Sequence, residues 1–130
     1  MVEQLVLELA KRKVVIGGSR VLVLGLSFKE NCTDLRNTRV VDVIDALGRY
    51  GMEAVVVDPW GDTQEAQSEF GLEVLTQIPA GDTYQAVIAA VSHRQFTALT
   101  SKQWQQLLKP KGLLLDLKGI LPRKLEAIRL

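Results

Sequence analysis

Short, continuously apolar runs recur along the chain and alternate with segments of helical periodicity. Because hydrophobic residues in these runs do not alternate with polar ones, the runs are typical of strands buried on both faces of a parallel sheet. We expect core strands at residues 20–24, 53–58, 86–91 and 112–116, and a short edge strand at residues 72–75.

The segments between these runs predict helices. The clearest helix spans residues 38–50, with charged side chains on its outer face and Gly51 placed to end it. Its apolar stripe consists of Val40, Val41, Ile44 and Leu47. Weaker helices are expected at residues 64–70 (ended by Gly71), 95–99 and 102–108, with a turn at 110–112 and a tail at 121–130 that fits either helix or irregular structure.

An amphipathic helix also opens the chain, with no N-cap residue before it. Its apolar positions are Val2, Leu5, Val6, Leu9 and Ala10. Two interpretations fit, a natural helix with a frayed start and a piece of a longer protein. The element order, one helix and then repeated strand–helix units, predicts a single α/β domain. We expect a three-layer sandwich in which helices cover both faces of a mostly parallel sheet of about five strands.

Composition excludes several classes of protein. The 130 residues are 47% hydrophobic and 24% charged with a net charge of +1, and the basic residues are spread out, so no nucleic-acid footprint is present. One cysteine excludes an internal disulfide framework and a cysteine zinc cluster. No apolar run is long enough to span a membrane and no signal peptide is recognisable. These features fit a cytoplasmic protein.

Cationic side chains follow several of the expected strands. Lys29 and Arg36 come after the first strand, Arg94 after the strand at 86–91 and Lys118 after the last. Ligands of open parallel sheets lie outside the carboxyl ends of the strands, so we expect an anionic ligand there, such as a pyrophosphate. Residues 25–29 read Gly-Leu-Ser-Phe-Lys, which is neither G-x-G-x-x-G nor a P-loop, so binding is expected to use side chains.

Other polar residues have structural and functional interpretations that both remain open. For His93 we favour a helix start over a general base, and for Asp58 a turn over chemistry, although a receiver-like module would use Asp58 as a phosphoacceptor. Asp34 is interpreted as a cap or turn residue that could pair with Arg36. Cys32 is interpreted as a spectator thiol, because the only histidine is distant in the sequence.

Residues 25–38, Gly-Leu-Ser-Phe-Lys-Glu-Asn-Cys-Thr-Asp-Leu-Arg-Asn-Thr, resemble the G-x-x-[FY]-K-x-x-x-x-D-x-R-x-S signature of the UDP-glucose/GDP-mannose dehydrogenase family, in its C-terminal UDP-binding domain. The resemblance continues in order through residues 50–59, 84–93 and 115–119 and so covers nearly the whole chain. It is greatest to the bacterial branch that acts on UDP-N-acetylhexosamines, especially UDP-N-acetylgalactosamine.

The resemblance implies a Rossmann-like fold and a part in polysaccharide precursor synthesis. Such enzymes oxidise the C6 alcohol of a UDP-sugar to a carboxylate in two NAD-dependent steps, with a catalytic cysteine that Cys32 does not match. NAD would be bound mainly by a missing N-terminal domain. Residues 1–18 would be a connecting helix from a missing middle domain and residues 19–130 the UDP-sugar-binding domain. The fragment alone would be inactive, while the full-length protein would be a homodimer or larger.

Matched positions imply roles for four residues. Phe28 and Lys29 would contact the UDP-sugar, and Arg36 would reach NAD across the cleft. Lys118 stands where many members carry arginine and would contact the nucleotide without a bidentate fork. The resemblance implies no catalytic residue in this part of the enzyme. No metal ligand is expected, and the composition and charge predict no nucleic-acid or membrane partner.

Overall fold

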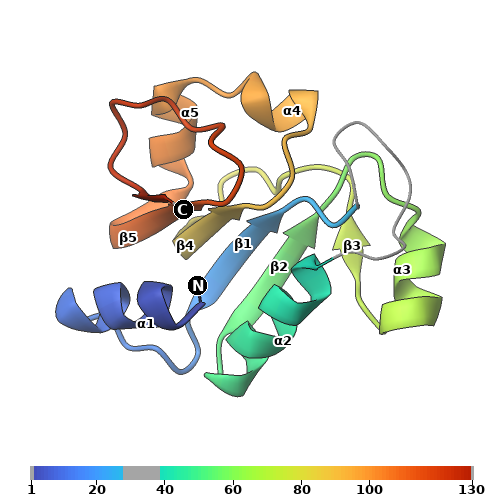
Figure 1. Cartoon of the computed structure of the whole chain (residues 1–130), viewed down its shortest axis with the longest axis horizontal. Coiled ribbons are helices and arrows are strands. Elements are labelled where there is room, and N and C mark those ends of the chain that lie inside the picture. The colour runs from blue at the N-terminus through green and yellow to red at the C-terminus, as the bar shows by residue number, and fades with distance from the viewer. Residues whose placement is uncertain (1, 28–38, 130) are drawn as a thin grey trace.

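A six-stranded, entirely parallel sheet forms the centre of the protein, in a computed structural model that describes residues 2–27 and 39–129 (Figure 1). The strands lie in the order β3-β2-β1-β4-β5-β6. Their bounds are β1 Arg20–Leu24, β2 Glu53–Val57, β3 Val74–Leu75, β4 Tyr84–Ala89, β5 Leu108–Asp116 and β6 Ile128–Arg129. Leu24, the last residue of β1, lies opposite Val57 of β2 on one side and Ala89 of β4 on the other, so the carboxyl ends of these three strands are level.

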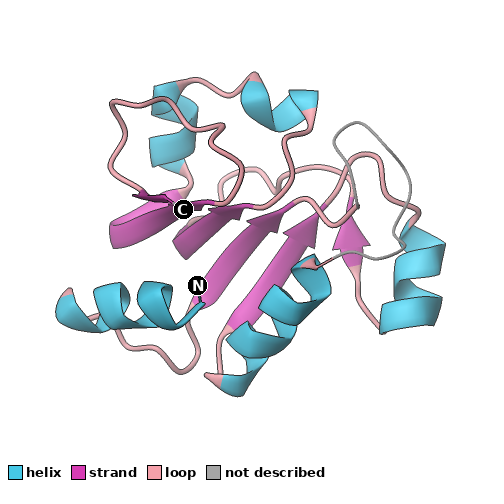
Figure 2. Cartoon of the chain, in the orientation of Figure 1, coloured by secondary structure: helices cyan, strands magenta, loops and turns pink. Residues whose placement is uncertain are grey.

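Helices cover both faces of this sheet (Figure 2). They are α1 Val2–Lys11, α2 Val40–Arg49, α3 Thr63–Phe70, α4 Arg94–Thr97 and α5 Ser101–Gln106. One face carries α1 and α2, and the other carries α4, α5 and the chain that follows β5 (Figure 1). Ala66 of α3 belongs to the same apolar core as α1 and α2. The protein is therefore a three-layer α/β sandwich.

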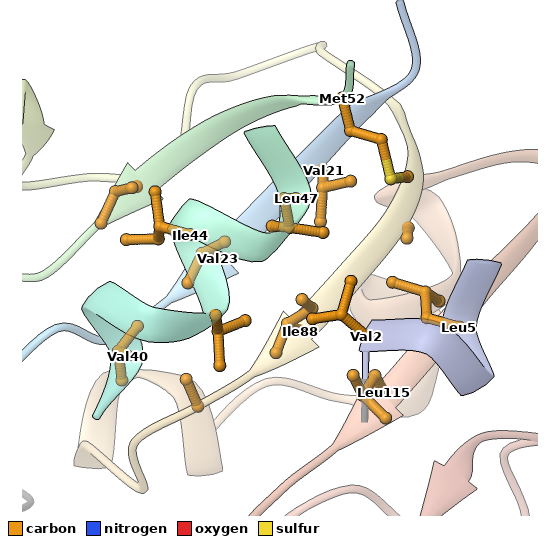
Figure 3. Close-up of a cluster of buried hydrophobic side chains, with 14 of the residues drawn as sticks. Val2, Leu5, Val21, Val23, Val40, Ile44, Leu47, Met52, Ile88 and Leu115 are labelled. Carbon is orange, nitrogen blue, oxygen red and sulfur yellow. The ribbon is translucent and has the colours of Figure 1, made fainter. Parts of the chain in front are cut away.

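Two apolar cores explain why the strand sequences are continuously hydrophobic. Successive residues of a strand point to opposite faces, so Val21 and Val23 enter one core while Leu22 and Leu24 enter the other. In the first core, side chains of α1 and α2 point onto the strands (Figure 3). The second core is built around Tyr84, Phe96 and Trp104, all buried.

Most of the predicted elements are confirmed, and the differences are local. The tail contributes a sixth strand, β6, where helix or irregular structure was expected. On α2, Val43 is buried while Val41 is only half-buried, so the apolar stripe is rotated from the one expected. The turn expected at residues 110–112 lies inside β5, which already begins at Leu108. It takes the form of a bulge: residues 109–112 lie opposite Gln85 alone, and Lys111 has φ of +67°.

Local sequence signals set several helix ends. Gly51 and Gly71 have φ of +76° and +64°, which confirms that they end α2 and α3. The Thr100 hydroxyl accepts from Gln103 N while the Gln103 side chain accepts from Thr100 N, a capping box that begins α5.

Candidate functional site at the carboxyl edge of the sheet

The strand order reverses between β1 and β4, which makes this part of the carboxyl edge the topological switch point of the sheet. From β1 the chain builds β2 and β3 on one side, then returns to place β4 on the other side of β1. The two loops therefore leave neighbouring strands in opposite directions, the point at which open α/β sheets bind ligands. The loops pass very close together here: a Cβ added to Gly25 would lie 2.5 Å from Val91 Cβ.

Asp58 connects the loops after β1 and β2. Its Oδ2 accepts hydrogen bonds from the backbone N–H groups of Leu26 (2.7 Å) and Ser27 (2.8 Å). Its Oδ1 accepts from the N–H groups of Trp60 (2.7 Å) and Gly61 (2.8 Å). Both oxygens are thus used to hold backbone that has left the sheet, and the Asp58 side chain is fully buried.

His93 joins the loop after β4 to the same carboxylate. Its Nε2 lies 3.1 Å from Asp58 Oδ2 and 3.0 Å from Ser27 Oγ, and both His93 and Ser27 are buried. A carboxylate only accepts, so Nε2 carries the hydrogen of the bond to Asp58. Burial raises the pKa of Asp58, but the hydrogen bonds from His93 and from the N–H groups of Leu26, Ser27 and Trp60 outweigh burial and hold this pKa well below its usual range.

This cluster is not a hydrolase triad. In a Ser-His-Asp triad the serine and the aspartate contact different nitrogens of the imidazole. Here Ser27 and Asp58 both contact Nε2 of His93, and all three residues are inaccessible to a substrate. His93 is the N-cap residue of α4, as predicted, and the general-base interpretation loses its support.

The receiver-like alternative is also wrong. A phosphoacceptor carboxylate must be reached by a phosphodonor, whereas Asp58 is fully buried with both oxygens hydrogen-bonded to backbone N–H groups. The predicted turn role of Asp58 is correct, because the carboxylate accepts from the second and third residues after it.

An aromatic–cation pair lies on the exposed side of the same edge. The guanidinium carbon of Arg94 is 4.8 Å from the centre of the Trp60 ring, within the range of a cation–π contact. The indole Nε1 of Trp60 donates to Oε1 of Gln95 at 2.9 Å. Arg94 is exposed, so its charge is presented at the carboxyl edge.

A second buried carboxylate organises the loop after β5. Asp116 accepts from the N–H groups of Ile120 (3.0 Å) and Leu121 (3.1 Å) and forms an ion pair with Arg129 Nη1 at 3.0 Å. Arg129 also donates to backbone carbonyls of the same loop, among them that of Leu125 at 3.1 Å. Lys118 lies within this fixed loop and is exposed.

The structure places some of the predicted site residues. Arg94 and Lys118 follow β4 and β5, which are neighbours in the sheet, so the expectation of cations from separate strands at one edge is met by these two. The predicted ligand contacts Phe28, Lys29 and Arg36 lie outside the described residues, as do Cys32 and Asp34. The predictions missed the joint role of Asp58 and His93. The sequence signal that could have indicated this role is the position of Asp58 directly after the apolar run of β2.

The described residues do not fit NAD bound in the Rossmann manner. That manner uses backbone N–H groups just after the first strand to hold a pyrophosphate. Here the N–H groups of Leu26 and Ser27 are already taken by Asp58. Within residues 2–27 and 39–129 no group of three or more His, Cys, Asp or Glu side chains could hold a metal ion, and no helix is long and apolar enough to cross a membrane.

Comparison with known protein families shows to which family the chain belongs. The family described as UDP-glucose/GDP-mannose dehydrogenase family, UDP binding domain, matches residues 22–123. The chain belongs to this family. UDP-N-acetyl-D-glucosamine 6-dehydrogenase of Salmonella typhi is 40% identical to it over 128 residues, 98% of this chain and 30% of that protein. The protein of the same name from Pseudomonas aeruginosa is 38% identical over 130 residues, 100% of this chain and 31% of that protein.

Solved structures of dehydrogenases share the fold. An NDP-N-acetyl-D-galactosaminuronic acid dehydrogenase from Methanosarcina mazei superimposes with a TM-score of 0.78 at 20% identity, covering 90% of this chain and 24% of that one. GDP-mannose dehydrogenase of Pseudomonas aeruginosa gives a TM-score of 0.65 at 20% identity, covering 98% and 30%. The Rossmann-like fold expected for the family is confirmed. The chain spans about 30% of the length of the curated relatives it matches.

Proposed function

We propose that this chain binds the UDP part of a UDP-N-acetylhexosamine and serves an NAD-dependent nucleotide-sugar 6-dehydrogenase. The observation that carries the proposal is the match of residues 22–123 to the UDP binding domain of the family. The names of the Salmonella and Pseudomonas relatives support an N-acetylhexosamine as the sugar. Exposed cations at the carboxyl edge, Arg94 and Lys118, support an anionic ligand.

Roles at the site follow from the same proposal. Phe28 and Lys29 contact the UDP-sugar, and Lys118 contacts the nucleotide from a loop that Asp116 and Arg129 hold in place. Arg36 reaches NAD bound by another domain, because the backbone after β1 is already engaged by Asp58. The catalytic cysteine also belongs to another part of the enzyme. Residues 1–18 then form the connecting helix and residues 19–130 the binding domain.

Titration of the chain with UDP, followed by NMR, tests the proposal. We expect chemical-shift changes at Phe28, Lys29 and Lys118, weaker binding by the Lys118→Ala variant, and no NADH formation by the chain with NAD and UDP-sugar. Lys109→Ala is the matched control, because Lys109 is an exposed lysine near the start of β5. UDP-N-acetylglucosamine and UDP-N-acetylgalactosamine, titrated in parallel, distinguish the epimers. Shift changes confined to other surfaces would overturn the site assignment. NADH formation would overturn the proposal that NAD binding and the catalytic cysteine lie in other parts of the enzyme.

A further inference from the structure

The buried contacts of Ser27, Asp58 and His93 form a closed triangle that holds three loops. Asp58 Oδ2 lies 2.8 Å from Ser27 N and 3.1 Å from His93 Nε2, and that Nε2 lies 3.0 Å from Ser27 Oγ. The three residues follow β1, β2 and β4, so one small cluster fixes the loops after three adjacent strands. We call these three residues the loop brace.

The loop brace begins where the hydrogen bonding of the sheet ends. The ladder beside β1 ends with Gly25 N donating to Val57 O on one side and with Val91 N donating to Leu24 O on the other. Beyond it the N–H groups of Leu26 and Ser27 have no strand to pair with, and Asp58 accepts both. The backbone after β1 is therefore held from both neighbouring strands up to Ser27.

The charged loop brace is not expected to be more stabilising than apolar side chains of the same volume at these three positions. Burying a carboxylate costs solvation, and apolar residues of similar volume are often as stabilising as a buried ionic pair. What the polar brace adds is a defined path for the chain, because Asp58 accepts from the backbone N–H groups of Leu26 and Ser27 and His93 holds the Asp58 carboxylate in place. The close approach of Gly25 to Val91 leaves the backbone little room for another path.

We propose that Asp58 and His93 are positioning residues for nucleotide binding: the loop brace fixes the backbone of Leu26 and Ser27, directly before the proposed UDP contacts Phe28 and Lys29 in the sequence. This inference rests on the proposed function. Neither residue touches the ligand, because both are buried. They act through the backbone of Leu26 and Ser27.

Three variants test the role. His93→Leu removes the imidazole donor while keeping a buried side chain. We expect UDP binding to be roughly tenfold weaker, by analogy with metal sites, where loss of a residue that supports a ligand costs about tenfold or more. His93→Gln puts an amide donor in place of Nε2 and should recover most of the affinity. Met52→Ala is the control, because Met52 is buried just before β2, at the opposite end of that strand from Asp58. It lowers stability and should leave UDP affinity within twofold of wild type, a range expected for a site it does not contact.

Amide hydrogen exchange without ligand gives a second readout. In His93→Leu the amides of Leu26 and Ser27 should exchange at least about tenfold faster, while amides in the middle of β1 change only with global stability. If His93→Leu does not fold, Ser27→Ala, which removes only the hydroxyl, should show both effects in weaker form. A purely structural role would give equal affinity loss in Met52→Ala and no recovery in His93→Gln.

The outcomes separate this inference from the proposed function. Failure of the wild-type chain to bind UDP overturns the proposed function and, with it, the nucleotide-positioning role. UDP binding by wild type that is unchanged in folded His93→Leu, or in Ser27→Ala, overturns the positioning role alone. Affinity loss that follows stability across all variants, Met52→Ala included, also overturns the positioning role alone.

Discussion

The Gly25→Ala substitution tests the packing on which the carboxyl edge depends. Gly25 has φ of +107°, in the region that L-residues avoid, and it directly follows β1. A Cβ at this position would lie 2.5 Å from Cβ, 2.7 Å from Cγ2 and 2.9 Å from the backbone N of Val91. Val91 is buried and its backbone N–H is hydrogen-bonded to Leu24, so it cannot move without disturbing the β1–β4 pairing.

Two costs add in this variant. An alanine in the positive-φ region costs roughly 1–2 kcal/mol, and overpacking a well-filled interior typically costs about 1–3 kcal/mol. The free energy of unfolding should therefore fall by roughly 2–5 kcal/mol, a large part of the total for a small domain. Gly81→Ala is the matched control, since Gly81 has φ of +80° with no atom within 4 Å of an added Cβ. Only the backbone cost of about 1–2 kcal/mol applies there.

Urea unfolding followed by circular dichroism measures both variants. We expect Gly25→Ala to lose clearly more stability than Gly81→Ala. Combining Gly25→Ala with Val91→Ala should restore less than half of the loss, because Cβ and the backbone N of Val91, the contacts at 2.5 and 2.9 Å, remain. Equal losses in Gly25→Ala and Gly81→Ala would refute the argument that the two loops are in tight contact.

Two further predictions concern buried polar groups. Tyr84 Oη is buried with no hydrogen-bond partner among the described residues. Tyr84→Phe should therefore leave the free energy of unfolding, measured by urea titration, unchanged or raise it by up to about 1 kcal/mol. A decrease of more than about 1 kcal/mol would show that the hydroxyl has a partner. The pKa of Asp58 is lower in the folded state than its ordinary value of 3.8, so its contribution to stability is present above that value and is lost as the pH falls toward the folded-state pKa. The test compares the free energy of unfolding of His93→Gln, which has no imidazole, with that of the double variant His93→Gln/Asp58→Asn. The difference between them should be constant above about pH 5 and shrink below about pH 4. A difference that grows on acidification would contradict the predicted direction.

Local signals were sufficient for most of the fold. The apolar runs locate four core strands because each is buried on both faces, and glycines at positions 51 and 71 mark helix ends through their positive φ. Strand β6 could not be predicted in this way. It is two residues long, and its place follows from pairing with β5 and from the ion pair between Arg129 and Asp116, which are distant contacts rather than periodicity.

The candidate site also depends on contacts between distant residues, which local sequence patterns do not predict. Asp58 and His93 are 35 residues apart, and nothing local to either residue indicates the other. They meet because β4 lies beside β1 rather than beside β3, which is a property of the strand order. The sequence indicates that polar residues gather at one edge, because every parallel strand ends there. It does not indicate which of them are buried partners.

That distinction bears on how an edge with several aspartates could accommodate the anionic ligand proposed above. Asp58 and Asp116 are both buried, and their oxygens are directed at backbone N–H groups and at His93 or Arg129. Arg94 and Lys118 are exposed on loops at the same edge. Among the described residues, Arg94 and Lys118 therefore place positive charge on the surface of this edge, while the carboxylates of Asp58 and Asp116 act inside the protein as acceptors that hold the loops. The exposed Asp62 accepts from the N–H groups of Gln64 and Glu65 and caps α3. Counting charges along the sequence would treat Asp58 and Asp116 as part of the surface, whereas their burial removes both from the charge that a ligand would meet.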